Sequence, residues 1–290
     1  MREFKTYHPV VNFVYFAAVI IFSCFFMHPI CLAFSLICAF TYSVMLKGKS
    51  AAWKNLMYML PLIAASALIN PAFNHEGVTI ITYLPSGNPL TEESVVYGVC
   101  AAAMIAGVIC WFSCCNEIMT SDKLIYLFGK TAPHLSLVFS MTLRFVPRFI
   151  NQFKTVAASQ RGIGRDVSDG GIFARAKNGL CILSIVVTWA LENAVETADS
   201  MKSRGYGLPG RTAFSIFTFD KRDKKALFCI AALVIYIIVG AAVGRLYFRF
   251  FPSVKGADFS VYTASVFVCY ILLCAYPIIT ELVEVRRWRI

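Results

Sequence analysis

Charged side chains are scarce in this sequence. Aspartate, glutamate, lysine and arginine make up 15% of its 290 residues, whereas hydrophobic residues make up 58%. None of the four charged types occurs in six long apolar stretches, at residues 10–28, 30–46, 56–73, 94–115, 226–243 and 259–279. A water-soluble domain does not need so much apolar sequence, and about 20 apolar residues cross a bilayer as a helix. The composition therefore predicts an all-α integral membrane protein with about six transmembrane helices.

Motifs for nucleotide and metal chemistry are also missing. There is no G-x-x-x-x-G-K-[ST] phosphate loop, so any ATP must be bound by another protein. The stretch from Gly205 to Gly210 matches G-x-G-x-x-G, but it follows a helical pattern and Pro209 interrupts it. The four histidines lack metal-ligand spacing, and Thr79 stands where a metalloprotease helix beginning at His75 needs a second histidine. We therefore expect no cofactor, no metal and no catalytic residue in this chain.

The positive charges are unevenly distributed along the chain. Lysine and arginine number 27, and the formal net charge is +11. With a cytoplasmic N-terminus, 24 of these 27 side chains fall on the cytoplasmic side of the expected spans. The positive-inside rule therefore predicts cytoplasmic N- and C-termini. Charge that flanks apolar spans indicates contact with the lipid bilayer, and we expect no nucleic-acid partner.

A polar central segment divides the chain into three regions. Residues 1–115 hold four of the expected spans, and residues 226–290 hold the other two. The central segment, residues 116–225, carries 16 basic and 9 acidic residues. Its periodicity is typical of two long amphipathic helices. We expect these helices to form a cytoplasmic coupling domain.

The first of these helices has an aromatic face beside a basic one. Phe145 and Phe149 are one helical turn apart, and Arg144 and Arg148 lie next to them. We interpret the two arginines as headgroup contacts or as partners in salt bridges on the helix surface. In the second helix, the apolar run at residues 180–191 is too short to span a membrane. Both helices are therefore expected to lie on the cytoplasmic side.

Both helices are expected to end in the same short motif. The two copies are Gln160-Arg161-Gly162 and Ser203-Arg204-Gly205. A glycine at this place can adopt the left-handed conformation that terminates a helix, and the helix dipole favours the preceding arginine. Capping alone explains one such end, but the repetition indicates two matching sites for a partner. Arginine offers a planar fork of donors to carboxylates or carbonyls in a groove.

These motifs and their surroundings resemble a known family. The stretches that carry the resemblance are both Arg-Gly motifs, LRFVPRF, ETADSMKSRGYG, GRTAFSIFTFDKRD and NPAFNHEGVTIITYLPSGNPLTEESVVYG. Over residues 52–225 the chain resembles the transmembrane T component of energy-coupling factor (ECF) transporters. The family motif is Ala-Arg-Gly, and Gln160 and Ser203 replace its alanines here.

The resemblance implies a non-catalytic scaffold in the bacterial plasma (inner) membrane. Two coupling helices would each dock in a groove of one subunit of a dimeric ABC-type ATPase, and these partners would bind ATP and Mg. A separate small membrane subunit, the S component, would bind a vitamin, a metal ion or another micronutrient. The residues expected to dock are Arg161, Gly162, Arg204 and Gly205, supported by Gln160, Ser203, Arg144 and Arg148.

Two other functions fit parts of the sequence. A self-contained secondary transporter or channel explains the spans, but such proteins place ionisable residues inside the membrane, and the six stretches have none. A basic anchor on the lipid surface explains the charge of the central segment but not its repeated motif. In the T-component interpretation the S component, not this chain, determines the transported substrate.

Overall fold

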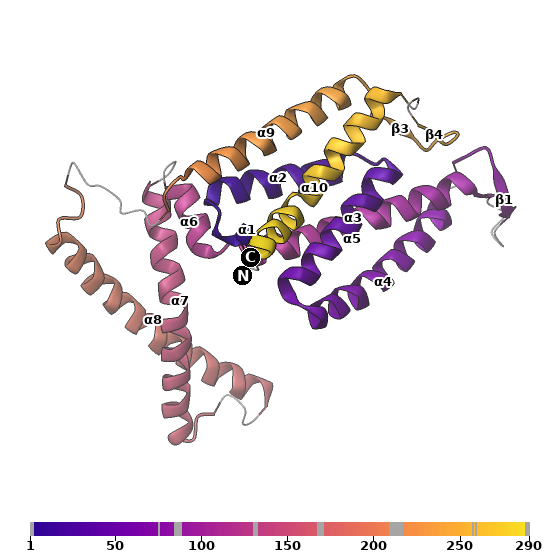
Figure 1. Cartoon of the computed structure of the whole chain (residues 1–290). Helices are drawn as coiled ribbons and strands as arrows, with labels where there is room; N and C mark the ends of the chain where they lie inside the picture. The colour runs from indigo at the N-terminus through magenta and orange to yellow at the C-terminus, as the bar shows by residue number, and fades with distance from the viewer. Residues whose placement is uncertain are drawn as a thin grey trace. The chain divides into compact units, whose positions relative to one another are not determined.

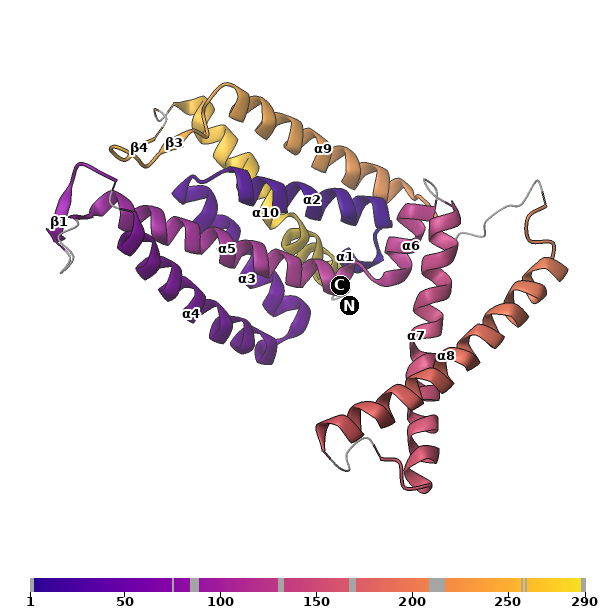
Figure 2. The same cartoon turned by 180° about the vertical axis from the view of Figure 1, so that it is seen from behind.

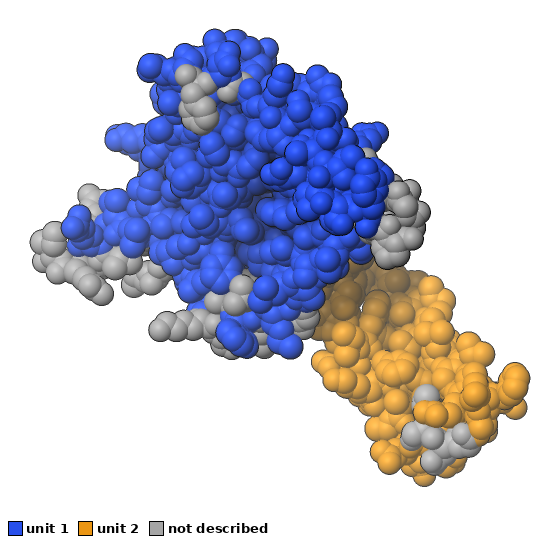
Figure 3. Space-filling view, turned by 90° about the vertical axis from the view of Figure 1, so that its right-hand side faces the viewer, with its two compact units in different colours: residues 1–124, 217–290 blue, residues 125–216 orange. Residues whose placement is uncertain are grey.

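In its described residues the chain consists of helices and two short strand pairs, as shown by a computed structural model (Figure 1). The structure describes residues 3–74, 76–83, 89–129, 133–166, 171–208, 217–256, 258 and 260–287. Two compact units are present, unit 1 with residues 1–124 and 217–290 and unit 2 with residues 125–216 (Figure 3). Unit 2 is thus an insertion between the two halves of unit 1. The all-α class predicted from composition is confirmed.

Unit 1 is a bundle of long apolar helices. Its helices are α1 (Glu3–Thr6), α2 (Pro9–Phe25), α3 (Pro29–Lys47), α4 (Lys49–Phe73), α5 (Glu92–Ile118), α9 (Lys221–Ala242) and α10 (Val261–Arg287). Each of the six predicted spans coincides with one of the helices α2 to α5, α9 and α10. By length and composition, α3, α5, α9 and α10 can cross a membrane, while α2 and the Met59–Pro71 part of α4 are shorter apolar helices.

The core of unit 1 lies around α5. This helix packs against α4, α3 and α2, and α10 packs against α3 and α9 (Figures 1 and 2). Trp111 of α5 is fully buried and donates its indole N–H to Ser35 Oγ at 3.0 Å. The Ser35 hydroxyl is also 2.9 Å from Ser23 Oγ. Because the interior of a bilayer offers no water, these polar groups are paired with one another.

The first two long helices begin in the same way. Pro9 and Pro29 occupy the first helical positions of α2 and α3. The preceding residues, His8 and His28, each accept a backbone N–H through Nδ1 at 3.3 Å. Proline is tolerated at this position because its missing N–H has no helical partner anyway. The His-Pro pair therefore starts a new helix after a very short connection.

Two antiparallel strand pairs lie at one end of unit 1. Strand β1 (Ile80–Tyr83) pairs with β2 (Pro89–Thr91), and β3 (Phe248–Arg249) pairs with β4 (Lys255–Gly256). Helix α1 and the C-terminal end of α10 lie at the opposite end of the unit (Figures 1 and 2). The two ends of the bundle are therefore marked by different structures.

Unit 2 consists of two long helices that cross. Helix α6 (Ser121–Gly129) leads from unit 1 into this unit, followed by α7 (Pro133–Gly162) and α8 (Ile172–Ser203). Helices α7 and α8 cross near their middles (Figures 1 and 2). At the crossing the ring of Phe149 lies edge-on to Trp189, with centroids 5.9 Å apart.

Two expectations about the central segment can be compared with the helix bounds. The expected limits at residues 115/116 and 225/226 fall inside helices, because α5 continues to Ile118 and α9 begins at Lys221. The expectation that the second helix is too short an apolar run to span a membrane is also wrong, because by length and composition α8 qualifies. Its apolar sequence continues past Leu191 to Val195, with Glu192 as the only charge in between.

Candidate functional site

The two Arg-Gly motifs lie at the C-terminal ends of the two helices of unit 2. Helix α7 ends at Gly162 and α8 ends at Ser203, as the sequence predicts. Both views show these helix ends at separate extremities of unit 2 (Figures 1 and 2). The two motifs therefore lie at different places on unit 2.

The glycine that terminates α7 is Gly164. Its φ is +79°, whereas Gly162 is the last helical residue and has no positive φ. The Gly164 N–H donates to the Arg161 carbonyl and the Arg165 N–H donates to the Gln160 carbonyl, both at 3.0 Å. These two bonds define a Schellman motif. The prediction that Gly162 adopts the left-handed conformation is wrong, because the helix continues to the next available glycine.

Helix α8 ends in the same motif at the glycine that was predicted. Gly205 has a φ of +78°, and its N–H donates to the Lys202 carbonyl at 2.9 Å. The Tyr206 N–H donates to the Met201 carbonyl at 3.0 Å. Arg204 therefore occupies the cap position, whereas the corresponding arginine of α7 lies inside the last helical turn. The two ends share a motif in sequence but differ in register.

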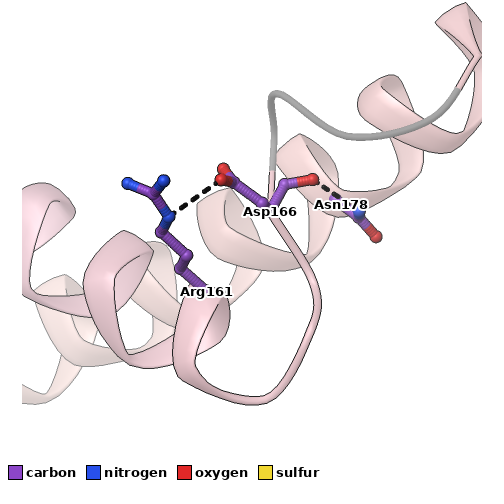
Figure 4. Close-up of polar contacts among 3 residues, drawn as sticks. All are labelled: Arg161, Asp166 and Asn178. Carbon is purple, nitrogen blue, oxygen red and sulfur yellow. Dashed lines mark hydrogen bonds and ion pairs between the residues drawn. The ribbon is translucent and has the colours of Figure 1, made fainter.

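The two arginines also differ in their contacts. Arg161 Nε lies 3.1 Å from Asp166 Oδ2, although the Arg161 side chain is 75% exposed (Figure 4). The Asp166 carbonyl accepts a hydrogen bond from Asn178 Nδ2 of α8 at 2.9 Å, which ties the connection between the helices to α8. Arg204 is exposed, and within the described ranges no ion pair or hydrogen bond of its side chain is found. Sequence reasoning did not identify Asp166 or Asn178.

Gln160 and Ser203, which precede the arginines, have different environments. The Ser203 hydroxyl donates to the Asp199 carbonyl at 2.6 Å within α8. Such a bond satisfies the hydroxyl inside its own helix. Gln160 is half-buried, and its Oε1 has no hydrogen-bond donor among the residues that the structure describes. This oxygen atom is itself buried, although the residue as a whole is only half-buried.

Gly162 has no conformational reason to be glycine. A Cβ built at this position meets no atom of the described chain within 4 Å, and the backbone there is helical. Glycine inside a helix is less favourable than alanine by about 1 kcal/mol. An alanine would therefore fit at this position without strain in the described chain.

The two arginines in the middle of α7 separate into different roles. Arg148 Nη2 donates to Asn193 Oδ1 at 2.9 Å, and its guanidinium carbon lies 5.3 Å from the centroid of the Trp189 ring. Arg148 therefore fastens α7 to α8 at their crossing. Arg144 is exposed, without a comparable contact in the described part of α8. Trp189 and Asn193 were not identified from sequence, although their spacing of one helical turn places them on one face.

Some sequence features fall outside the described residues. His75, the first residue of the incomplete metalloprotease motif, is one of these, and residues 209–216 after the second Arg-Gly motif are others. Among the described residues, no three histidine, cysteine, aspartate or glutamate side chains form a group that could hold a metal.

Several known transport proteins are similar to this chain. The sequence profile of a family described as cobalt transport protein (CbiQ) matches residues 2–216, which include both Arg-Gly motifs. The chain is 33% identical over 118 residues to the energy-coupling factor transporter transmembrane protein EcfT of Lactobacillus helveticus (strain DPC 4571), covering 40% of this chain and 43% of that protein. It is 27% identical over 161 residues to the protein of the same name from Acidaminococcus fermentans, covering 52% and 59%. The chain thus spans less than two thirds of the length of either relative. These similarities confirm the resemblance drawn from the motifs.

Proposed function

Because this chain belongs to the cobalt transport protein family CbiQ, we propose that it acts as the T component of an ECF-type ABC importer. In this role the multi-pass unit 1 is the membrane scaffold, and unit 2 is the coupling segment. The chain is non-catalytic. Two partner ATPase subunits bind ATP and Mg, and a separate S component binds the transported substrate.

The paired helix ends of unit 2 carry this proposal. Each end presents an exposed arginine, and the two ends lie at separate extremities of the unit. An arginine fork binds a carboxylate through two parallel hydrogen bonds, so each end suits an acidic groove. The open space around Gly162 also allows the backbone of a partner to approach. Two such grooves are supplied by a dimer of ATPase subunits.

The orientation and the substrate belong to the same proposal. In this proposal both termini and the two helix ends of unit 2 lie on the cytoplasmic side of a bacterial plasma membrane, and α8, which is long and apolar enough to enter a bilayer, lies against its cytoplasmic leaflet. The excess of lysine and arginine in these regions supports that orientation. The substrate is a vitamin, a metal ion or another micronutrient. The family description makes cobalt the first ion to test.

Affinity purification from the native membrane in mild detergent, followed by mass spectrometry, tests the proposal. The tagged chain should recover one or two ABC-type ATPases and a small apolar subunit. Arg161→Glu and Arg204→Glu should each lower ATPase recovery by about tenfold or more, because each leaves a carboxylate facing an acidic groove. Lys154→Glu is the matched control, since it reverses an exposed charge on α7 away from its end.

Two outcomes would count against the proposal. Full ATPase recovery with the Arg161→Glu and Arg204→Glu double variant would exclude these arginines as docking residues. A chain that purifies alone, under conditions that preserve a known membrane complex, would instead favour a self-contained transporter.

A further inference from the structure

A short N-terminal segment of unit 1 contacts both points where the chain passes between the units. This segment is residues 5–12, which we call the N-terminal clasp. It runs from the end of α1, through the His8 cap, into the first turn of α2. The chain leaves unit 1 after Leu124 and returns at Phe217. All the contacts that follow lie within unit 1.

Where the chain leaves unit 1, Lys123 of α6 contacts the clasp. Only 5% of this lysine is exposed. Its Nζ donates to the Lys5 carbonyl at 2.6 Å. The Asn12 amide satisfies its neighbours when its Oδ1 accepts from Lys123 Nζ at 2.7 Å and its Nδ2 donates to the Phe4 carbonyl at 3.1 Å. One buried ammonium group therefore joins the start of α6 to both ends of the clasp.

Where the chain re-enters unit 1, Asp223 of α9 contacts the middle of the clasp. This aspartate is 3% exposed, and its Oδ1 accepts the His8 N–H at 3.2 Å. Its Oδ2 accepts the Asp220 N–H at 3.2 Å, as part of the capping box that starts α9. The ring of His8 also meets Phe219 at a centroid distance of 4.8 Å. The start of α9 is therefore fixed to the residue that starts α2.

Arg222 provides a second link at the return. Its Nη2 donates to Thr6 Oγ1 at 2.9 Å, and its guanidinium carbon lies 4.3 Å from the centroid of the Tyr7 ring. Unlike Lys123 and Asp223, Arg222 is exposed, so these contacts lie on the surface of the clasp. The clasp thus has a buried contact with each of the two chain segments that join the units, through Lys123 and Asp223. Arg222 adds an exposed contact with the second segment.

We propose that the N-terminal clasp ties the two connections of unit 2 to each other, with Lys123, Asp223 and Arg222 as its positioning residues. Neither connection can shift against α2 without breaking hydrogen bonds to the same few residues. A displacement that arises in the coupling helices therefore reaches α2 and α9 together. This role rests on the proposed function, because it supplies the route by which ATP-driven motion enters the scaffold.

Hydrogen exchange of the full-length chain in detergent tests the clasp without any partner. Lys123→Met removes the link at the exit, and Arg222→Ala removes the exposed link at the return. If the clasp joins the two sides, Lys123→Met should speed exchange by about tenfold at residues 217–224 as well as near its own site. Arg222→Ala should likewise speed exchange at residues 119–124. Residues His8 and Asp220 are direct reporters, since both backbone N–H groups donate to Asp223.

Two matched variants separate the clasp from general destabilisation. Lys47→Met removes a lysine that bonds Ser113 Oγ at 2.6 Å within unit 1, between α3 and α5. Lys224→Ala removes an exposed charge next to Arg222. Neither should change exchange at both connections. Because Arg222 is exposed, its variant remains informative even if Lys123→Met fails to fold.

Exchange that rises only beside each substitution would overturn the proposal, since the two connections would then open independently. Reciprocal change on both sides supports it. ATPase recovery measured with the same variants should stay at the wild-type level, because the helix ends are intact. Loss of the reciprocal effect refutes the clasp alone, whereas failure to recover any ATPase with the wild-type chain refutes the proposed function.

Discussion

The Nε atom of Arg161 lies 3.1 Å from Oδ2 of Asp166, and among the residues that the structure describes the two terminal guanidinium nitrogens have no partner. Figure 4 shows no contact between those nitrogens and the other residues drawn. Asp166 is itself held by the Asn178 side chain, through its backbone carbonyl. Arg161 is thus already oriented, with its fork available to a carboxylate. Arg204 has no such support in the described structure, so under the proposed function its side chain would become ordered only on docking.

Replacing Asp166 tests whether it orients Arg161. An exposed ion pair contributes at most about 1 kcal/mol, so Asp166→Asn should weaken binding of a purified ATPase subunit by less than about tenfold. Biolayer interferometry measures the change, and Asp122→Asn serves as a control on an exposed carboxylate of α6. The effect should vanish in an Arg161→Glu background. Tighter binding of Asp166→Asn would show that Asp166 competes with the partner.

The glycines at the helix ends should respond in opposite directions to alanine. Gly164→Ala and Gly205→Ala place a side chain at positive φ and should destabilise the helix ends by about 1 kcal/mol or more. Gly162→Ala lies in helical backbone with open space around it and should stabilise α7 by up to about 1 kcal/mol. Hydrogen exchange at residues 160–166 and 201–208 measures both effects. Equal destabilisation by all three changes would contradict the assigned conformations.

A further expectation concerns Gly162 and the partner. If this glycine permits close approach, Gly162→Ala should weaken ATPase binding while it stabilises the helix. Unchanged binding would show that the space around Gly162 is not used.

Trp189 should be the main side chain that holds α7 and α8 together. Trp189→Ala removes the edge-on contact with Phe149 and the cation–π contact with Arg148. Because the ring is only half-buried, we expect a loss of about 2 kcal/mol, below the cost of a fully buried aromatic. Limited proteolysis between residues 163 and 171 reports the opening of the pair. Leu191→Ala, an exposed position on the same helix, should have little effect.

Lys123 should give the stability of the protein a distinct pH dependence. Burial, assisted by the nearby charge of Lys5 and opposed by Asp223, lowers the pKa of Lys123 from 10.5 to about 8. His8 also lies near these charges, and burial lowers its pKa as well. Between pH 8 and 10.5 the unfolded chain keeps the Lys123 proton while the folded chain loses it. The contribution of Lys123 to stability therefore rises with pH in this window.

Thermal unfolding in detergent at pH 7.5 and at pH 10 measures this contribution. The wild-type chain should gain stability relative to Lys123→Met between the two conditions. His8 titrates below this window and does not affect the difference. A difference between the two proteins that is constant with pH would contradict the lowered pKa of Lys123.

The orientation of the chain can be tested with a membrane-impermeant maleimide on intact cells. An engineered cysteine at Glu92, beside the β1–β2 pair, should be labelled from outside. An engineered cysteine at Arg165 should react only after the membrane is permeabilised. Both positions are exposed. Because native cysteines such as Cys229 are exposed too, the labelling of the parent chain is subtracted from that of each variant. The reverse pattern would invert the proposed topology.

The apolar helices could be predicted from sequence because each depends on local composition alone. Uncharged runs of roughly membrane length predict α2 to α5, α9 and α10 wherever they pack. The ends of α7 and α8 were also predicted, since Arg-Gly after a helical pattern is a local signal. The prediction for Gly162 was wrong because the same short stretch contains a second glycine, Gly164, at which a helix can end equally well.

Contacts between distant residues could not be predicted in this way. Arg148 was interpreted as a headgroup or salt-bridge residue, but its partners are the amide of Asn193 and the ring of Trp189. Lys123 was counted as one more positive charge of the central segment. Its burial against residues 5–12 depends on how the bundle closes, and no spacing within one stretch of sequence encodes that closure.

The separation of the two helix ends within unit 2 has a consequence for binding kinetics. When a chain docks at two places, the second contact forms within the same complex. The effective concentration of the second site is then roughly millimolar. Each contact can then be weak by itself while the assembly stays long-lived. If unit 2 docks on two ATPase subunits as proposed, one helix end could detach and rebind during a cycle of ATP hydrolysis while the other end keeps the subunits from diffusing apart.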